Sequence, residues 1–145
     1  MEELRDILDE KGRRVWSVRP DDTVYRALEV MAEANIGALV VLTDSGELVG
    51  VVSERDIARH GVSHKADLFD LPVREIMSRR IRSAPAAMSI DTCMALMTAE
   101  RVRHVPVFEG ERLDGIVSIG DVVKAMVHEK DIVIEQLEHY ISSSL

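Results

Sequence analysis

The chain has 145 residues and a mass of 16.2 kDa, a size that suits one compact domain or two small, interlocked halves. Its hydrophobic share of 46%, with only 3% aromatic residues, predicts a core of aliphatic side chains and methionine. A formal charge of -8 argues against nucleic-acid binding, because contact with phosphates needs clustered lysine and arginine.

The first half predicts a short amphipathic helix, an extended segment, a helix and two strands. Thr23 precedes regularly spaced apolar residues and is a good N-cap for the main helix. The two strands are nearly continuous runs of valine and leucine, which is typical of strands buried on both faces. The predicted ranges, in chain order, are 4–8, 15–18, 23–35, 37–44 and 48–54.

The second half repeats this order of parts. GVVSERD at 50–56 recurs as GIVSIGD at 115–121. The matching residues are all 65 positions apart, which indicates a sequence repeat and not merely a similar amino-acid composition. A two-stranded hairpin cannot bury its own apolar faces, which explains why the chain contains two copies of the unit. The matching ranges are 73–77, 81–84, a helix that begins after Ser89, 104–109 and 113–118.

These patterns predict one compact pair of repeats with flanking helices. The predicted parts are a first repeat with the N-terminal helix (1–60), a surface linker with at most one helical turn (61–72), a second repeat (73–127) and a helical extension (128–145). The last helix is longer than one repeat needs. With the N-terminal helix it offers apolar surface for self-association, and we expect a homodimer, although packing onto its own domain is the alternative.

The repeated Ser-x-x-Asp elements have two interpretations. Ser53 and Ser118 stand where a buried strand meets a helix, so each can be an N-cap, with Asp56 and Asp121 completing a capping box. The same geometry also suits a nucleotide. A helix N-terminus attracts phosphate, and a carboxylate beside it can accept both hydroxyls of a ribose.

The chain resembles a tandem pair of CBS domains, also called a Bateman module. The resemblance rests on the two repeated elements, on RHVPVFE at 103–109 and on PDDTVYRALEVM at 20–31, and it extends from about Leu4 to Met126. It implies an α/β (α+β) fold in which two β-α-β-β-α repeats pack through their strands around a pseudo-twofold axis. It also implies two clefts for adenosine ligands such as AMP, the first choice, or ADP, ATP, NAD(H) or S-adenosylmethionine.

The resemblance also implies roles for individual residues. Asp56 and Asp121 match the ribose-binding acids, and Ser53 and Ser118 match hydroxyls near ribose or phosphate. Arg103 matches a phosphate-binding position in the second half, and Arg55 lies beside Asp56 in the first. The positions implied to line the adenine are Ile36, Ala38, Leu39, Val102, His104, Val105, Val15, Ser17, Ile81 and Ser83.

We therefore expect a regulatory adenosine-nucleotide sensor that acts on an unidentified protein partner, with a ligand-independent interaction scaffold as the alternative. No catalytic motif is evident, so we expect no enzyme. His60 and His64 lack a third nearby ligand, so we expect no metal site. Cys93 has no disulfide partner, and the start of the chain lacks a signal peptide, so we expect a cytoplasmic protein with no membrane contact.

Overall fold

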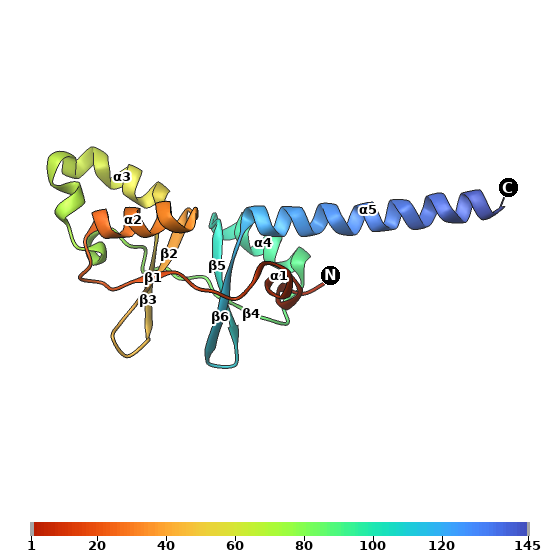
Figure 1. The fold of residues 1–145 in the computed structure, drawn as a ribbon, viewed down its shortest axis with the longest axis horizontal. Helices are drawn as coiled ribbons and strands as arrows, with labels where there is room; N and C mark the ends of the chain where they lie inside the picture. Colours follow the sequence, from red (N-terminus) through yellow and green to blue (C-terminus); the bar gives the residue numbers. More distant parts are fainter. Residues whose placement is uncertain (1, 145) are drawn as a thin grey trace. The chain divides into compact units, whose positions relative to one another are not determined.

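The structure is a computed structural model that describes residues 2–144, and it separates into two compact units (Figure 1). One unit is the continuous segment Arg14–Ile81. The other combines residues 2–13 with residues 82–144. Each unit contains one three-stranded sheet covered by helices, so the predicted α+β class is confirmed.

The unit Arg14–Ile81 has the strand order β1-β2-β3, with β1 parallel to β2 and β2 antiparallel to β3. Its core contains Leu39, Val41 and Val52 from the sheet and Val24 and Met31 from the first main helix. The elements are β1 (Ser17–Val18), α2 (Val24–Ala34), β2 (Ala38–Leu42), β3 (Leu48–Ser53), α3 (Glu54–His64) and two 3-10 helices, η1 (Lys65–Asp70) and η2 (Val73–Glu75).

The second unit repeats this sheet with the order β4-β5-β6 and the same pairing. Val105, Val107 and Val117 of the sheet pack with Ile90 and Met97 in its core. The elements are α1 (Leu4–Lys11), β4 (Ala84–Pro85), α4 (Ile90–Glu100), β5 (His104–Glu109), β6 (Arg112–Ser118) and α5 (Ile119–Ser144).

Local capping sets the ends of the two main helices. Thr23 Oγ1 accepts the Arg26 amide at 3.1 Å, and Ser89 Oγ accepts the Thr92 amide at 3.1 Å, which confirms both predicted N-caps. At the other ends, Asn35 and Arg101 each adopt a left-handed conformation with φ of 54°. The chain can therefore turn directly from helix to strand in both repeats.

The N-terminal helix α1 opens the first repeat in sequence, but it packs in the unit that holds the sheet of the second repeat. Leu4 and Leu8 are fully buried in that unit's core. Leu8 lies over Gly115, where an added Cβ would come within 2.6 Å of it. In the unit Arg14–Ile81, Met77 lies over Gly50 in the same way, at 2.5 Å. The first segment of each repeat thus packs on the sheet of the other repeat.

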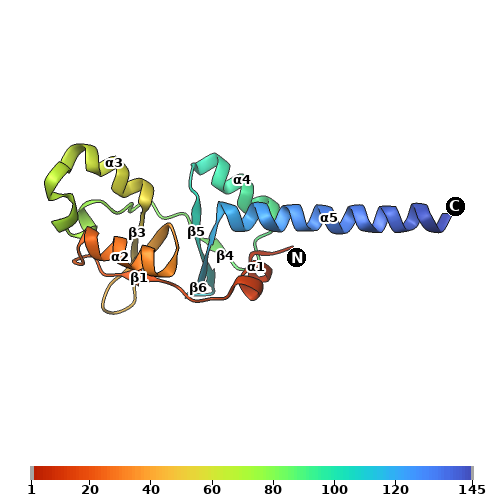
Figure 2. The same cartoon turned by 45° about the horizontal axis from the view of Figure 1, so that its top comes forward.

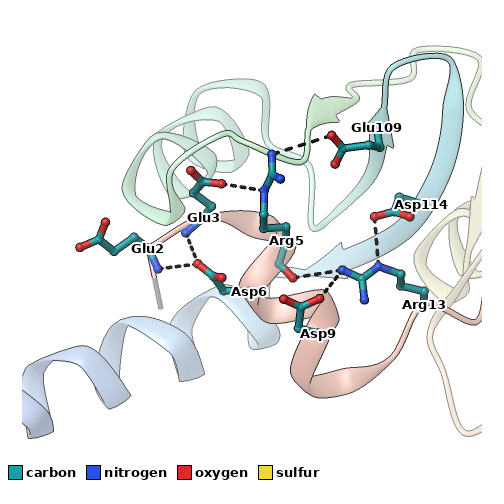
Figure 3. Close-up of polar contacts among 8 residues, drawn as sticks. All are labelled: Glu2, Glu3, Arg5, Asp6, Asp9, Arg13, Glu109 and Asp114. Atoms are coloured by element: carbon teal, nitrogen blue, oxygen red, sulfur yellow. Dashed lines mark hydrogen bonds and ion pairs between the residues drawn. The ribbon is translucent and has the colours of Figure 1, made fainter.

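Polar contacts fix α1 in place (Figure 3). Arg13 donates to the Asp114 carboxylate through Nε at 3.1 Å and also pairs with Asp9. The Asp114 side chain is only 6% exposed, so its charge needs such a partner. At the other end of the helix, Asp6 accepts the amides of Glu2 and Glu3, which lowers the pKa of the Asp6 carboxyl, chiefly through the Glu3 amide. Both ends of α1 are therefore tied down.

The segment 61–72 lies in the unit Arg14–Ile81, where much of it is helical and Leu68 is buried in the core. Tyr25 meets Phe69 edge-to-face at a ring distance of 6.3 Å. The Val24 amide donates to the Leu71 carbonyl at 2.9 Å. The segment 73–81, which opens the second repeat in sequence, also packs in this unit.

The last helix, α5, runs without a break through the predicted boundary between residues 127 and 128. Figures 1 and 2 show its C-terminal part extending past the other elements of its unit. Charged residues interrupt its apolar positions. No helix among residues 2–144 combines the length and the apolar character that crossing a membrane requires.

Replacing Leu8 with alanine tests the exchange of leading segments. The substitution opens a cavity beside β6 and should cost about 2–5 kcal/mol. Hydrogen exchange should therefore show faster exchange first at 104–118. Met77→Ala, at the equivalent position of the other repeat, is the matched control and should act first on 38–53. Faster exchange at 38–53 in Leu8→Ala, with 104–118 unchanged, would contradict this packing.

Candidate ligand site

The two Ser-x-x-Asp elements form the same junction in both units. Ser53 ends β3 and α3 begins at the next residue; Ser118 ends β6 and α5 begins at the next residue. The amide of Asp56 donates to Ser53 Oγ at 3.1 Å, and the amide of Asp121 donates to Ser118 Oγ at 3.1 Å. Each serine therefore caps its helix, as the first interpretation predicts.

Each aspartate returns a hydrogen bond to its cap. Asp56 Oδ2 accepts the Ser53 amide and hydroxyl, both at 2.9 Å. Asp121 Oδ2 accepts the Ser118 amide at 2.9 Å. Within residues 2–144, neither Oδ1 receives a hydrogen bond. Both junctions therefore present one carboxylate oxygen to a hydroxyl donor, at a helix N-terminus that favours anions.

The second junction carries a cation that the first does not. Lys11 Nζ donates to Asp121 Oδ2 at 2.7 Å and to the Ile116 carbonyl at 3.0 Å. Burial raises the pKa of the Asp121 carboxyl, but the hydrogen bonds from Lys11 and Ser118 outweigh burial and hold that pKa below 3.8. The Asp56 carboxylate accepts hydrogen bonds only from Ser53 among the described residues. The two aspartates are thus electrostatically unequal.

Asp121 and Lys11 also line a cavity of about 280 Å³ between α1 and the start of α5. Its other lining residues are Ile7, Glu10, Lys124, Ala125 and His128. The cavity therefore places two lysines and two carboxylates around the first turns of α5. Charge of both signs is available there to a polar ligand.

The segment before each central strand lies against its Ser-x-x-Asp junction, as predicted. The Glu54 amide donates to the Gly37 carbonyl at 3.0 Å, and the Ile119 amide donates to the Arg103 carbonyl at 2.8 Å. The strand register pairs Ala38 with Ser53 and His104 with Ser118. The structure therefore brings 36–39 to Asp56 and 102–105 to Asp121.

Not all of the predicted contact residues expose a side chain. Leu39 and Val105 are fully buried in the two cores, because alternate strand positions point inward. They can offer a ligand only backbone groups, and their predicted place beside the adenine stays a prediction. Ala38 is also buried; Ile36, Val102 and His104 are partly buried, and Arg55 and Arg103 are exposed.

The short extended segments divide between the units. Val15 and Ser17 belong to the unit of Asp56, where Ser17 pairs with Val40 across the parallel β1–β2 ladder. Ser83 belongs to the unit of Asp121, immediately before β4. Ile81 closes the unit Arg14–Ile81. Its predicted place beside the second junction stays a prediction.

Lys11 is the one contact to these carboxylates that sequence reasoning missed. It is 110 residues from Asp121 in sequence, and it follows a helix that the repeat pattern attaches to the other half. No motif marks it among the lysines and arginines of the chain. Only the observed packing of α1 places it at this site.

The expectation of no metal site stays a prediction. Among the side chains that the structure describes, no group of three or more histidine, cysteine, aspartate or glutamate residues could hold an ion. The predicted weak candidate paired His60 with His64, and the side chain of His64 lies outside the described residues. Cys93 is fully buried, and burial raises the pKa of its thiol.

Comparison with known proteins agrees with the geometry. The CBS domain profile matches residues 4–63 and 73–133. A solved CBS-domain protein from Agrobacterium tumefaciens shares 38% identity with a TM-score of 0.84, covering 86% of this chain and 93% of that one. The mitochondrial CBS domain-containing protein CBSX3 of Arabidopsis thaliana is 34% identical over 95% of this chain and 71% of its own length.

A further relative is the CBS domain-containing protein YhcV of Bacillus subtilis, which is 31% identical over 82% of this chain and 84% of its own length. The two matched segments account for both repeated junctions and both sheets. The chain therefore belongs to the CBS domain family and carries two copies of the domain.

Proposed function

We propose that this protein is a regulatory module that binds an adenosine ligand, with AMP the first candidate and ADP, ATP, NAD(H) or S-adenosylmethionine as the others. One observation carries the proposal: each Ser-x-x-Asp junction leaves Oδ1 of its aspartate available beside a helix N-terminus. A vicinal diol next to a phosphate or another charged group matches that arrangement.

The surrounding residues supply the rest of a nucleoside site. The partly buried Ile36 and Val102 offer apolar contact to the base, and backbone groups of 38–39 and 104–105 can read its edge. The exposed guanidinium groups of Arg55 and Arg103 are suited to phosphate. In this proposal the Asp56 and Asp121 carboxylates accept the ribose hydroxyls.

Two relatives support a regulatory ligand rather than catalysis. A CBS domain pair solved in complex with 5′-methylthioadenosine and S-adenosyl-L-methionine shares this fold, with a TM-score of 0.77 at 23% identity. The chain also matches 21% of the inosine-5′-monophosphate dehydrogenase of Methanocaldococcus jannaschii, at 32% identity. That match fits a module separable from a catalytic body. We infer that ligand occupancy is passed to a protein partner.

A scaffold without a ligand is the second candidate, and the observed caps favour it. Ser53, Asp56, Ser118 and Asp121 all make capping hydrogen bonds, so each has a structural role without any nucleotide. Capping of this kind contributes about 1 kcal/mol per helix. Loss of stability on mutation therefore cannot by itself identify a ligand site, and affinity must be measured separately.

Thermal shifts with adenosine compounds distinguish the two candidates. A ligand at 100 times its Kd should stabilise the protein by about 2.7 kcal/mol, a shift of several degrees. We expect the shift with an adenosine compound and not with adenine-free nucleotides, and we expect Asp56→Ala with Asp121→Ala to abolish it. Asp6→Ala is the matched control, because Asp6 makes the same capping contact in α1. No shift of the parent with any adenosine compound would favour the scaffold. A full shift in the folded double variant would place the ligand away from the two aspartates.

The Lys11 contact predicts unequal binding at the two junctions. Because the Lys11 ammonium at Oδ2 already neutralises the Asp121 carboxylate and makes its Oδ1 a weaker acceptor, we propose that the Asp56 junction fills first. In an Asp56→Ala background, Lys11→Met should tighten binding at Asp121 by up to about tenfold, because the unpaired carboxylate accepts the ribose hydroxyls more strongly. Titration calorimetry measures this, with Lys124→Met in the same cavity as control. Weaker binding in Lys11→Met would instead assign Lys11 to the ligand's phosphate.

The lowered pKa of Asp121 predicts how the Lys11 contact depends on pH. A carboxyl whose pKa falls on folding stabilises the protein above its unfolded pKa, and this contribution is lost as the pH falls through the folded value. Lys11→Met should therefore be less stable than the parent in urea at pH 7, and the gap should close as the pH falls through the lowered folded pKa of Asp121. A gap that does not change with pH would show that Lys11 acts through packing alone.

A further inference from the structure

Exposed apolar side chains are concentrated on α5. Of the twelve large hydrophobic residues exposed in the described chain, nine belong to this helix. They continue beyond the part of α5 that packs against its own unit, where Val122 and Ala125 are buried. Figures 1 and 2 show no other element of the unit beside the C-terminal part of the helix. A helix with such an uncovered face is stabilised by a partner.

Most of these exposed residues follow a heptad; Ile132, on the opposite face of the helix, is the exception. Val127, Ile134 and Ile141 are spaced by seven residues at one position, and Val123, Lys130 and Leu137 are spaced by seven at the other. These are the a and d positions of a coiled coil. Apart from Lys130, their exposed fractions are 45–57%. The seam from Val123 to Ile141 is about 27 Å long, from the helical rise of 1.5 Å per residue.

One flank of the seam is apolar and the other is charged. Met126, Val133 and Tyr140 occupy the g positions, whereas Lys124, Asp131 and Glu138 occupy the e positions. Beside this flank lies a shallow groove of about 480 Å³, lined by Met126, Glu129, Lys130, Val133 and Ile134 and by Asp91 of α4. Flanking residues set partner choice and orientation in coiled coils.

We propose that this face binds α5 of a second copy of the chain in an antiparallel two-stranded coiled coil. In that register Val127 packs on Leu137 of the partner helix, Ile134 on Lys130 and Ile141 on Val123. The apolar flanks then meet each other. The charged flanks also meet. Lys124 of each chain pairs with Glu138 of the partner helix, which gives two attractive pairs, and the two Asp131 side chains form the one repulsive pair.

A parallel arrangement fits the same residues poorly. It would place Lys130 opposite Lys130 inside the seam, where like charges repel. It would also set the apolar Val133 against the partner's Glu138 and would form no complementary pair between the flanks. A lipid surface is a poor occupant too, because Glu129, Asp131, Glu135 and Glu138 give α5 a predominantly acidic polar face. The proposal stands independently of nucleotide binding.

The oligomeric state tests the seam. Sedimentation of the parent chain should give twice the 16.2 kDa mass of one chain. Ile134→Glu with Leu137→Glu should weaken the dimer by at least about 100-fold, because each change occurs twice in the seam. Gln136→Glu with His139→Glu adds the same charge on the opposite face and should leave the dimer intact. Both positions are exposed, so folding is not at risk.

Three results would overturn the proposal: a parent that stays monomeric at about 0.1 mM, a seam variant that dimerises as tightly as the control, or a monomeric parent that binds anionic lipid vesicles through Leu137.

The relative orientation of the two α5 helices is tested by disulfide formation in a Cys93→Ala background. Val127→Cys chains mixed with Leu137→Cys chains should crosslink only with each other. Crosslinking of either variant with itself would establish a parallel pair and overturn the antiparallel one.

Discussion

The close packing of a side chain on a glycine in each sheet is the constraint on which the rest of the structure depends. Leu8 lies on Gly115 and Met77 lies on Gly50, at distances that leave no room for a Cβ. Each sheet has only three strands and needs a covering segment to complete its core. Because the covering segment comes from the leading part of the other repeat, neither repeat contains all of its own core.

That exchange also decides the electrostatics of the candidate site. Placing α1 on the second sheet brings Lys11 to Asp121, whereas the contacts of Asp56 come from its own cap. Two junctions with the same Ser-x-x-Asp spacing thus become chemically different. The capping role and the proposed ligand role do not compete, because the cap uses Oδ2 and leaves Oδ1 to a ligand. A site built in this way couples ligand binding to the start of a long helix.

The helix that begins at the second junction connects the two proposals physically. Asp121 lies in the first turn of α5, and the heptad seam begins at Val123, two residues later. A ligand at the junction and a partner helix on the seam would therefore touch the same rigid element. Both proposed sites would then share α5, the element through which a coupling free energy between ligand and partner would act.

What the sequence determined by itself was the local structure. The repeat, the α+β class, the valine-rich strands, the caps at Thr23 and Ser89 and the two Ser-x-x-Asp junctions follow from short-range spacing, and the structure confirms them. Only the tertiary structure decided that α1 covers the second sheet, that 61–72 joins the first core and that Lys11 meets Asp121. These contacts form between segments that are distant in sequence. The periodicity of a segment predicts which of its faces is buried, but it does not predict which sheet that face packs against.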